Sequence, residues 1–141
     1  MNINIVNKSE NPLPKYARNG DAGMDICAAE DGHISPFSWK AVSTGLYVEI
    51  PDGYEIQIRS RSGLAFKHGI VVLNSPGTID SGYRGEIKVI LKNHDHHRYI
   101  IKKGERIAQM VVSEFTKASL TEVAELSETE RGEGGLGSTG K

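Results

Sequence analysis

The feature that most constrains the fold of this chain is a series of short alternating segments separated by turn residues. In residues 54–59, Tyr, Ile and Ile alternate with Glu, Gln and Arg, and a period of two is typical of a strand with one buried face. Glycine, proline and aspartate separate such segments roughly every eight to twelve residues, which favours an all-β sandwich, jelly roll or barrel. Strands are expected at residues 2–6, 21–28, 39–42, 46–50, 54–59, 70–73, 86–91, 99–101, 106–112 and 120–126.

One short helix is expected at residues 61–69, with Ser62 as its capping residue. Residues 33–38, which contain a proline, are expected to form a loop.

Composition limits the classes of function. The 141 residues suit one domain, and a formal net charge of -1 gives no basic surplus for direct nucleic-acid binding. No apolar run approaches the roughly 18 residues that cross a membrane. The single cysteine, Cys27, leaves no internal disulfide framework. A small core residue in a protein of the reducing cytoplasm is therefore expected at that position.

Residues 77–91 combine a glycine-rich turn with an alternating strand. Asp80 and Tyr83 lie between the glycines, so that a carboxylate precedes a phenol ring by three residues. Taken alone, this pattern indicates a β-turn closed by Asp and Gly, with a packing aromatic. From residue 86 onward, aliphatic residues alternate with lysines, as in a half-buried strand.

The C-terminal segment differs in kind from the rest of the chain. Residues 132–140 contain five glycines and one large apolar side chain, too little apolar surface to offset the entropy of ordering the backbone. We therefore expect a β domain at 1–126 and a flexible arm at 127–141. Arg131, Ser138 and Thr139 suit a phosphate, because arginine offers a planar fork and the hydroxyls donate hydrogen bonds.

The polar residues fall into five islands, and together these islands closely resemble the motifs of the trimeric deoxyuridine triphosphatases (dUTPases). Any one motif is weak, but five in the family's order are specific and cover nearly the whole chain. The matching stretches are Ala-Gly-Met-Asp-Ile at 22–26, Arg-Ser-Gly-Leu-Ala at 61–65, Gly-Thr-Ile-Asp-Ser-Gly-Tyr at 77–83, Gly-Glu-Arg-Ile-Ala-Gln at 104–109, and the Gly-rich run at 131–140.

The resemblance implies a jelly-roll subunit in a homotrimer whose active sites lie between subunits. It also implies hydrolysis of dUTP to dUMP and pyrophosphate with Mg²⁺, by in-line attack of water on the α-phosphorus. That reaction limits uracil incorporation into DNA and supplies dUMP for thymidylate synthesis. The resemblance implies no direct contact with nucleic acid and no membrane.

The resemblance also assigns roles to individual residues. It implies that Asp80 deprotonates the attacking water, and that Asp25 holds Mg²⁺ through water. Tyr83 is expected to form the floor under the deoxyribose and exclude a 2′-hydroxyl, and Asn74 to read the uracil edge. The other substrate contacts that it implies are Arg61, Ser62, Gly63, Gly77, Thr78, Ile79, Lys88, Gln109, Arg131, Leu136, Gly137, Ser138 and Thr139.

Two positions depart from the family pattern. Ser60 replaces a usual proline but removes no reacting group. Leu136 stands where many members carry an aromatic that stacks on the uracil. Since leucine covers a base without stacking, a modest loss of affinity is expected there.

Other functions are weighed against this one. A dCTP deaminase shares the fold, but this chain has the Asp80 and Tyr83 arrangement and the Gly-rich arm. A zinc deaminase lacks support because its Pro-Cys-x-x-Cys signature is absent. A catalytically idle regulator is disfavoured by the retained polar residues, although a second role with a regulatory protein partner stays open. The His94–His97 tip is more often a solvated turn than a metal site.

Overall fold

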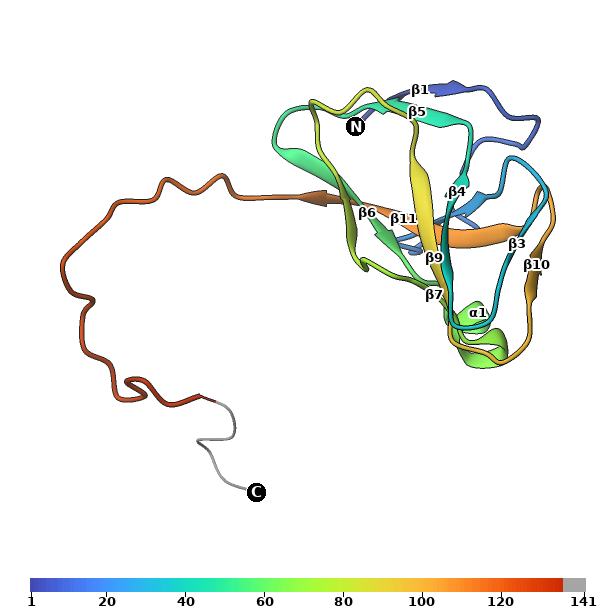
Figure 1. The fold of residues 1–141 in the computed structure, drawn as a ribbon. Helices are drawn as coiled ribbons and strands as arrows, with labels where there is room; N and C mark the ends of the chain where they lie inside the picture. Colours follow the sequence, from blue (N-terminus) through green and yellow to red (C-terminus); the bar gives the residue numbers. More distant parts are fainter. Residues whose placement is uncertain (136–141) are drawn as a thin grey trace.

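The computed structural model describes residues 1–135 of the chain. Within them the chain forms eleven strands and one short helix (Figure 1). In chain order the elements are β1 (Asn4–Asn7), β2 (Met24–Cys27), β3 (Gly32–Ile34), β4 (Trp39–Ser43), β5 (Leu46–Glu49), β6 (Tyr54–Arg59), α1 (Ser62–His68), β7 (Ile70–Val72), β8 (Gly77–Ile79), β9 (Lys88–Asn93), β10 (Tyr99–Ile101) and β11 (Arg106–Glu114).

The strands pair antiparallel in four small sheets. A four-stranded sheet has the order β2-β11-β6-β8, and a three-stranded sheet has the order β4-β9-β7. Two-stranded pairs, β1 with β5 and β3 with β10, complete the all-β jelly roll. Because most connections cross from one sheet to another, strands distant in sequence become neighbours, as in the pairing of β2 with β11.

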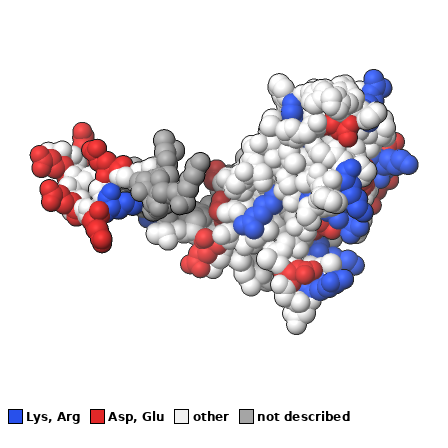
Figure 2. All heavy atoms as spheres, turned by 90° about the horizontal axis from the view of Figure 1, so that it is seen from below, with Lys and Arg blue, Asp and Glu red and all other residues white. Residues whose placement is uncertain are grey.

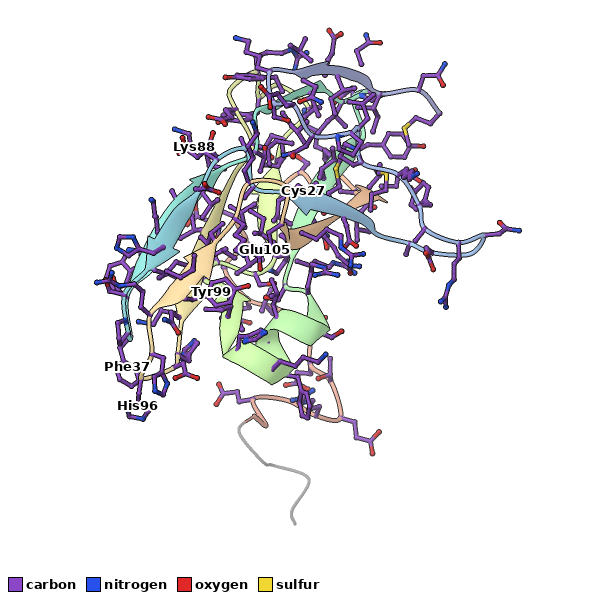
Figure 3. All side chains as sticks on the ribbon, turned by 90° about the vertical axis from the view of Figure 1, so that its right-hand side faces the viewer. Cys27, Phe37, Lys88, His96, Tyr99 and Glu105 are labelled. Carbon is purple, nitrogen blue, oxygen red and sulfur yellow. The ribbon has the colours of Figure 1, made fainter. Side chains whose placement is uncertain are left out.

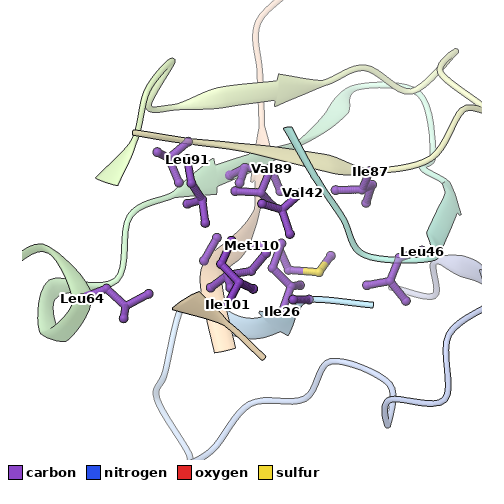
Figure 4. Packing of buried hydrophobic residues seen from close by; sticks show 14 of the residues in the cluster. Ile26, Val42, Leu46, Leu64, Ile87, Val89, Leu91, Ile101 and Met110 are labelled. Carbon is purple, nitrogen blue, oxygen red and sulfur yellow. The ribbon is translucent and has the colours of Figure 1, made fainter. Parts of the chain in front are cut away.

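The hydrophobic core lies between the two larger sheets. Val42, Val89 and Leu91 face it from the three-stranded sheet, and Ile26 and Met110 face it from the four-stranded sheet (Figure 4). All five side chains are buried. The period-two pattern of the sequence therefore corresponds to burial, and the predicted face of β9 is confirmed.

Most of the predicted strands are confirmed, and two short strands were not predicted. β3 lies at the start of the expected loop, and β8 was expected only as a turn. Both strands have three residues, too few to establish an alternating pattern. The helix is present, but its N-cap is Arg61, with extended backbone angles, and Ser62 is already helical. The proposed capping role of Ser62 is therefore wrong.

The prediction of a strand at 120–126 is also wrong for this single chain. After β11 ends at Glu114, the described chain runs away from the body without regular structure (Figure 1). Leu120 and Leu126 are exposed on it, at 95% and 88%. A strand needs a neighbour to satisfy its backbone groups, and no other segment within residues 1–135 pairs with this one.

Among the described residues no helix is long and apolar enough to span a bilayer. The one helix within residues 1–135, α1, has seven residues and is capped at its C-terminus by Gly69, whose φ of 61° is left-handed. Glycine adopts that conformation without the steric cost that a side chain would bring.

Asn93 joins two loops at one end of the body. Its side-chain amide is fully buried and donates to the carbonyls of Ile34, Ser35 and His97, at 3.2, 3.4 and 2.8 Å. Its side-chain oxygen accepts from the amide of Asp95 at 2.8 Å. One side chain thereby holds the turn after β3 against the turn after β9.

We expect Asn93→Ala to lower the free energy of unfolding by about 2–3 kcal/mol, because it leaves buried carbonyl groups without a donor. Urea unfolding at one fixed protein concentration measures this loss. Asn19→Ala, at an exposed loop position, is the matched control and should change stability by less than about 0.5 kcal/mol. Equal effects of the two substitutions would contradict the assigned role of Asn93.

Candidate active site

A cavity of about 320 Å³ opens beside β8. We call it the Asp80 pocket. Its walls come from β6 and β8, which pair with each other, from β4 and β9, which pair in the three-stranded sheet, and from the loops before and after β8. Seven residues expected to contact substrate or carry out the reaction line it. They are Asn74, Gly77, Thr78, Ile79, Asp80, Tyr83 and Lys88.

The pocket wall leaves little space for a side chain at Gly77. A Cβ there would lie 3.3 Å from the Asn74 amide nitrogen and 3.4 Å from Cβ of Ile58. The glycine therefore lets the Asn74 side chain lie directly against the backbone of β8. An amide group held in this way can donate and accept hydrogen bonds at the pocket wall.

The Tyr83 ring folds back over the chain that follows it. Its hydroxyl donates to the Glu86 carbonyl at 3.0 Å, and a Cβ at Gly85 would lie 2.3 Å from that hydroxyl oxygen. The backbone amide of Tyr83 donates to the carbonyl of Asp80 at 3.0 Å, which closes the turn. The ring remains 43% exposed and so presents a face to the pocket.

Glu86 also lines this pocket, and the sequence analysis did not identify it. Its carboxylate accepts from the hydroxyl of Ser43 and, at 2.9 Å, from the amide of Gly45. Burial by itself would raise the pKa of the Glu86 carboxyl. The hydrogen bonds from Ser43, Gly45 and Thr44, with the charge of Lys88, outweigh burial and lower that pKa.

A second cavity, also of about 320 Å³, lies where β2, β6 and β11 meet. We call it the Asp25 pocket. Asp25 and Gln109 line it, together with Lys15 and Arg59, which the sequence analysis had not identified. Gln109 faces Asp25 on β2 and Arg59 on β6 because β11 pairs with both strands.

Two arginines hold the Asp25 carboxylate. Arg61 Nε donates to one oxygen at 2.9 Å, and Arg106 Nη1 donates to the other at 3.3 Å. Arg61 also donates to the carbonyl of Arg106, at 3.1 Å. The carboxylate is 23% exposed, so it is oriented but still accessible to solvent.

A β-bulge in β11 brings Arg106 to this site. The register shifts between Arg106 and Ala108, so Ile107 and Ala108 are both buried in succession. In a regular strand, Arg106 and Gln109 would point to opposite faces, since they are three residues apart. Two adjacent apolar residues within an alternating segment were the signal that could have revealed this.

A polar pair, Tyr99 and Glu105, lies close enough to Arg61 for the guanidinium charge to act on Tyr99. The Tyr99 hydroxyl donates to the Glu105 carboxylate (Figure 3), and burial together with that carboxylate raises the pKa of Tyr99. The other Glu105 oxygen accepts from the Lys102 amide at 3.1 Å. Cys27 of β2 is partly buried, and burial raises the pKa of its thiol.

The two pockets have no lining residue in common. Ser62 and Gly63 begin α1 and line neither pocket, although Ser62 is next to Arg61. Arg131 lies on the outgoing chain, where its Nε donates to the carbonyl of Gly134 at 2.8 Å. Leu136, Gly137, Ser138 and Thr139 lie outside the described residues.

The His94–His97 tip is built as a turn. Asp95 accepts from the backbone and the ring of His97, both at 2.9 Å, and the His96 ring packs edge-on against Phe37 (Figure 3). Among residues 1–135, no group of three or more His, Cys, Asp or Glu side chains is arranged to hold a metal ion.

Comparison with known proteins matches residues 9–140 to the dUTPase family model. A deoxyuridine 5'-triphosphate nucleotidohydrolase of Nautilia profundicola is 59% identical over 92% of this chain and 91% of its own length. One from Finegoldia magna is 49% identical over 99% of each chain.

Solved structures agree with the sequence relatives. The Staphylococcus bacteriophage 80alpha dUTPase with dUPNHPP has a TM-score of 0.91 and 31% identity over 99% of each chain. A dUTPase from phage phi11 of S. aureus, described for its coordination of a structural Mg(II) ion, has a TM-score of 0.83 and 26% identity, and covers 91% of this chain and 100% of its own. The family model and the relatives span nearly the whole chain, and the chain belongs to the dUTPase family.

Proposed function

We propose that this protein hydrolyses dUTP to dUMP and pyrophosphate, which limits uracil incorporation into DNA and supplies dUMP for thymidylate synthesis. The observation that carries the proposal is the Asp80 pocket, in which a carboxylate, a phenol ring, an amide and a lysine meet in a chain of this family. Because deoxynucleotide pools are intracellular, we place the activity in the cytoplasm.

In this proposal the Asp80 pocket holds the nucleoside. Asn74, against the backbone of Gly77, pairs with the polar edge of uracil, and the Tyr83 ring lies under the deoxyribose. Asp80 accepts a proton from the water that attacks the α-phosphorus, as a general base. Gly77, Thr78 and Ile79 form the wall on β8, and Lys88 supplies positive charge at the rim.

The Asp25 pocket is proposed to hold the phosphates. Arg61, Lys15 and Arg59 bring positive charge to it, and Gln109 offers an amide that can donate to a phosphate oxygen. Ser62 and Gly63, next to Arg61 in the chain, complete this set.

The donor set of this pocket fits Mg²⁺. Mg²⁺ prefers oxygen ligands and keeps several waters, so it commonly uses one or two carboxylates together with substrate phosphates. Asp25 is such a carboxylate, partly exposed and oriented by Arg61 and Arg106. Asp25 would hold the ion through water, and the ion would neutralise phosphate charge as the leaving pyrophosphate departs.

Assembly as a homotrimer would unite the two pockets. Within one chain they have no lining residue in common, and we propose that one site combines the Asp80 pocket of one subunit with the Asp25 pocket of another. The outgoing chain supports this, because Leu120, Val123 and Leu126 are exposed on a segment that lies away from its own body (Figure 1). Residues 127–141 are then proposed as an arm that brings Arg131, Leu136, Gly137, Ser138 and Thr139 over the nucleotide of a neighbouring subunit.

The first test is the release of pyrophosphate from dUTP, dCTP, dTTP and UTP with Mg²⁺. We expect dUTP to be preferred strongly, and EDTA to abolish the reaction. Asp80→Asn should lower kcat by about a hundredfold or more with little change in dUTP binding, since asparagine keeps the shape but does not take up the proton.

Asp52→Asn is the matched control, because Asp52 is an exposed carboxylate in the turn between β5 and β6. It should behave like the original protein. Deamination of dCTP in place of pyrophosphate release would replace this proposal with a deaminase, and normal turnover by Asp80→Asn would exclude Asp80 as the base.

A second test concerns assembly. Light scattering should give three times the chain mass of 15.4 kDa. A chain ending at Phe115 should lose that assembly and its activity while its strand content is kept, because the core closes before the outgoing segment begins. A fully active monomer would contradict the trimer.

A further inference from the structure

The geometry points to Glu86 as a positioning residue for the choice between deoxyribose and ribose. We infer that its side chain fixes the position of the Tyr83 ring in the Asp80 pocket, because it holds the loop after β8 to the end of β4 and to the turn between β4 and β5. This inference rests on the proposed function, because it concerns how the same pocket selects its nucleotide.

The first step is that Gly85 and Glu86, which closely follow Tyr83 in the chain, support its ring. The ring lies on Gly85, where even a methyl group would collide with the hydroxyl, and that hydroxyl donates to the main-chain carbonyl of Glu86. A shift of the backbone at residues 85–86 therefore moves the ring directly.

The second step is that the side chain of Glu86 anchors this support to the body. Its carboxylate accepts from the hydroxyl of Ser43, the last residue of β4, and from the amide of Gly45 in the turn that follows. The next residue is also tied there, because Thr44 Oγ1 donates to the Ile87 carbonyl at 2.6 Å and the Ile87 amide donates to Leu46 at 2.8 Å.

The third step separates the roles of these bonds. The bonds to Ile87 use Thr44 and the backbone, and Ile87 is a fully buried core residue, so they hold the start of β9 in any variant of Glu86. The bonds to the Glu86 carboxylate act one residue closer to Tyr83. Loss of the carboxylate therefore frees the carbonyl beneath the ring without unfolding β9.

The charge around Glu86 keeps its carboxylate available as an acceptor. Lys88 Nζ lies 3.8 Å from the second oxygen, and the Glu86 side chain is 16% exposed while that of Lys88 is 58% exposed. Asp80 lines the same pocket. A carboxylate that accepts hydrogen bonds from a hydroxyl and an amide stabilises its charged form.

The consequence concerns sugar selectivity. A Tyr83 ring held in one position excludes the 2′-hydroxyl of a ribose by steric contact. A Tyr83 ring that is free to tilt admits that hydroxyl. Selectivity is the ratio of kcat/KM for dUTP to kcat/KM for UTP. A change in that ratio reports on the ring, whereas a general loss of folded protein lowers both values together.

The experiment measures this ratio for the original protein, Tyr83→Ala, Glu86→Ala and Glu86→Gln. Tyr83→Ala should lower the ratio most. Glu86→Ala should lower it by about five- to tenfold, the size expected for losing a hydrogen-bonded anchor. Glu86→Gln, which keeps one acceptor oxygen, should recover part of that loss.

Three further variants sharpen the result. Glu30→Ala removes an exposed carboxylate between β2 and β3 and should leave the ratio unchanged. Ser43→Ala removes the hydroxyl that donates to the Glu86 carboxylate. It takes the place of Glu86→Ala in this comparison if Glu86→Ala does not fold. The double variant of Tyr83→Ala with Glu86→Ala should match Tyr83→Ala alone, because the anchor acts through the ring.

A ratio for Glu86→Ala equal to that for Glu30→Ala would overturn the inference, even with the proposed function intact. An unchanged ratio for Tyr83→Ala would overturn it as well, since the ring would then not select the sugar. Absence of dUTP hydrolysis by the original protein would be a failure of the proposed function, and it is visible before any variant is made.

Discussion

Strand β11 pairs with β2 along one edge and with β6 along the other, and the rest of the structure depends on this double pairing. It unites the four-stranded sheet and places Met110 in the core opposite the second large sheet. The same register sets Gln109 between Asp25 and Arg59. Because side chains alternate along a strand, a slip of one residue would exchange its core and pocket faces.

Each pocket combines paired strands with loop segments. In the Asp25 pocket the strands are β2, β6 and β11 and the loop is the one before β2, and the carboxylate is held by Arg61, the N-cap of α1, and by Arg106, at the bulge of β11. In the Asp80 pocket the strands are β6 with β8 and β4 with β9, and the loops before and after β8 form the remaining wall. The loop after β8 needs its own anchors to be precise, and the end of β4 and the turn between β4 and β5 supply them.

Much of this could be predicted from the sequence, because period-two alternation reports directly on burial. The faces of β6 and β9 followed from it, and seven of the residues that the resemblance assigned to substrate contact or to the reaction line the Asp80 pocket. Arg106 was missed because a bulge changes the face of a residue without changing composition. Glu86 was missed because its partners lie more than forty positions away, in a turn with no chemical signature of its own. The error at 120–126 has another cause. Leu120, Val123 and Leu126 lie three positions apart, so the segment lacks the alternation of a half-buried strand, and no segment within residues 1–135 pairs with it.

The outgoing chain also bears on solubility. Its exposed leucines and valine form apolar surface that favours self-association. Glutamates at 122, 125, 128 and 130 are interspersed among them, and Figure 2 shows acidic side chains gathered on this part of the molecule. Such charges act as gatekeepers, because self-association would bring like charges together. The exposed apolar side chains of this segment are thus separated by carboxylates that resist aggregation.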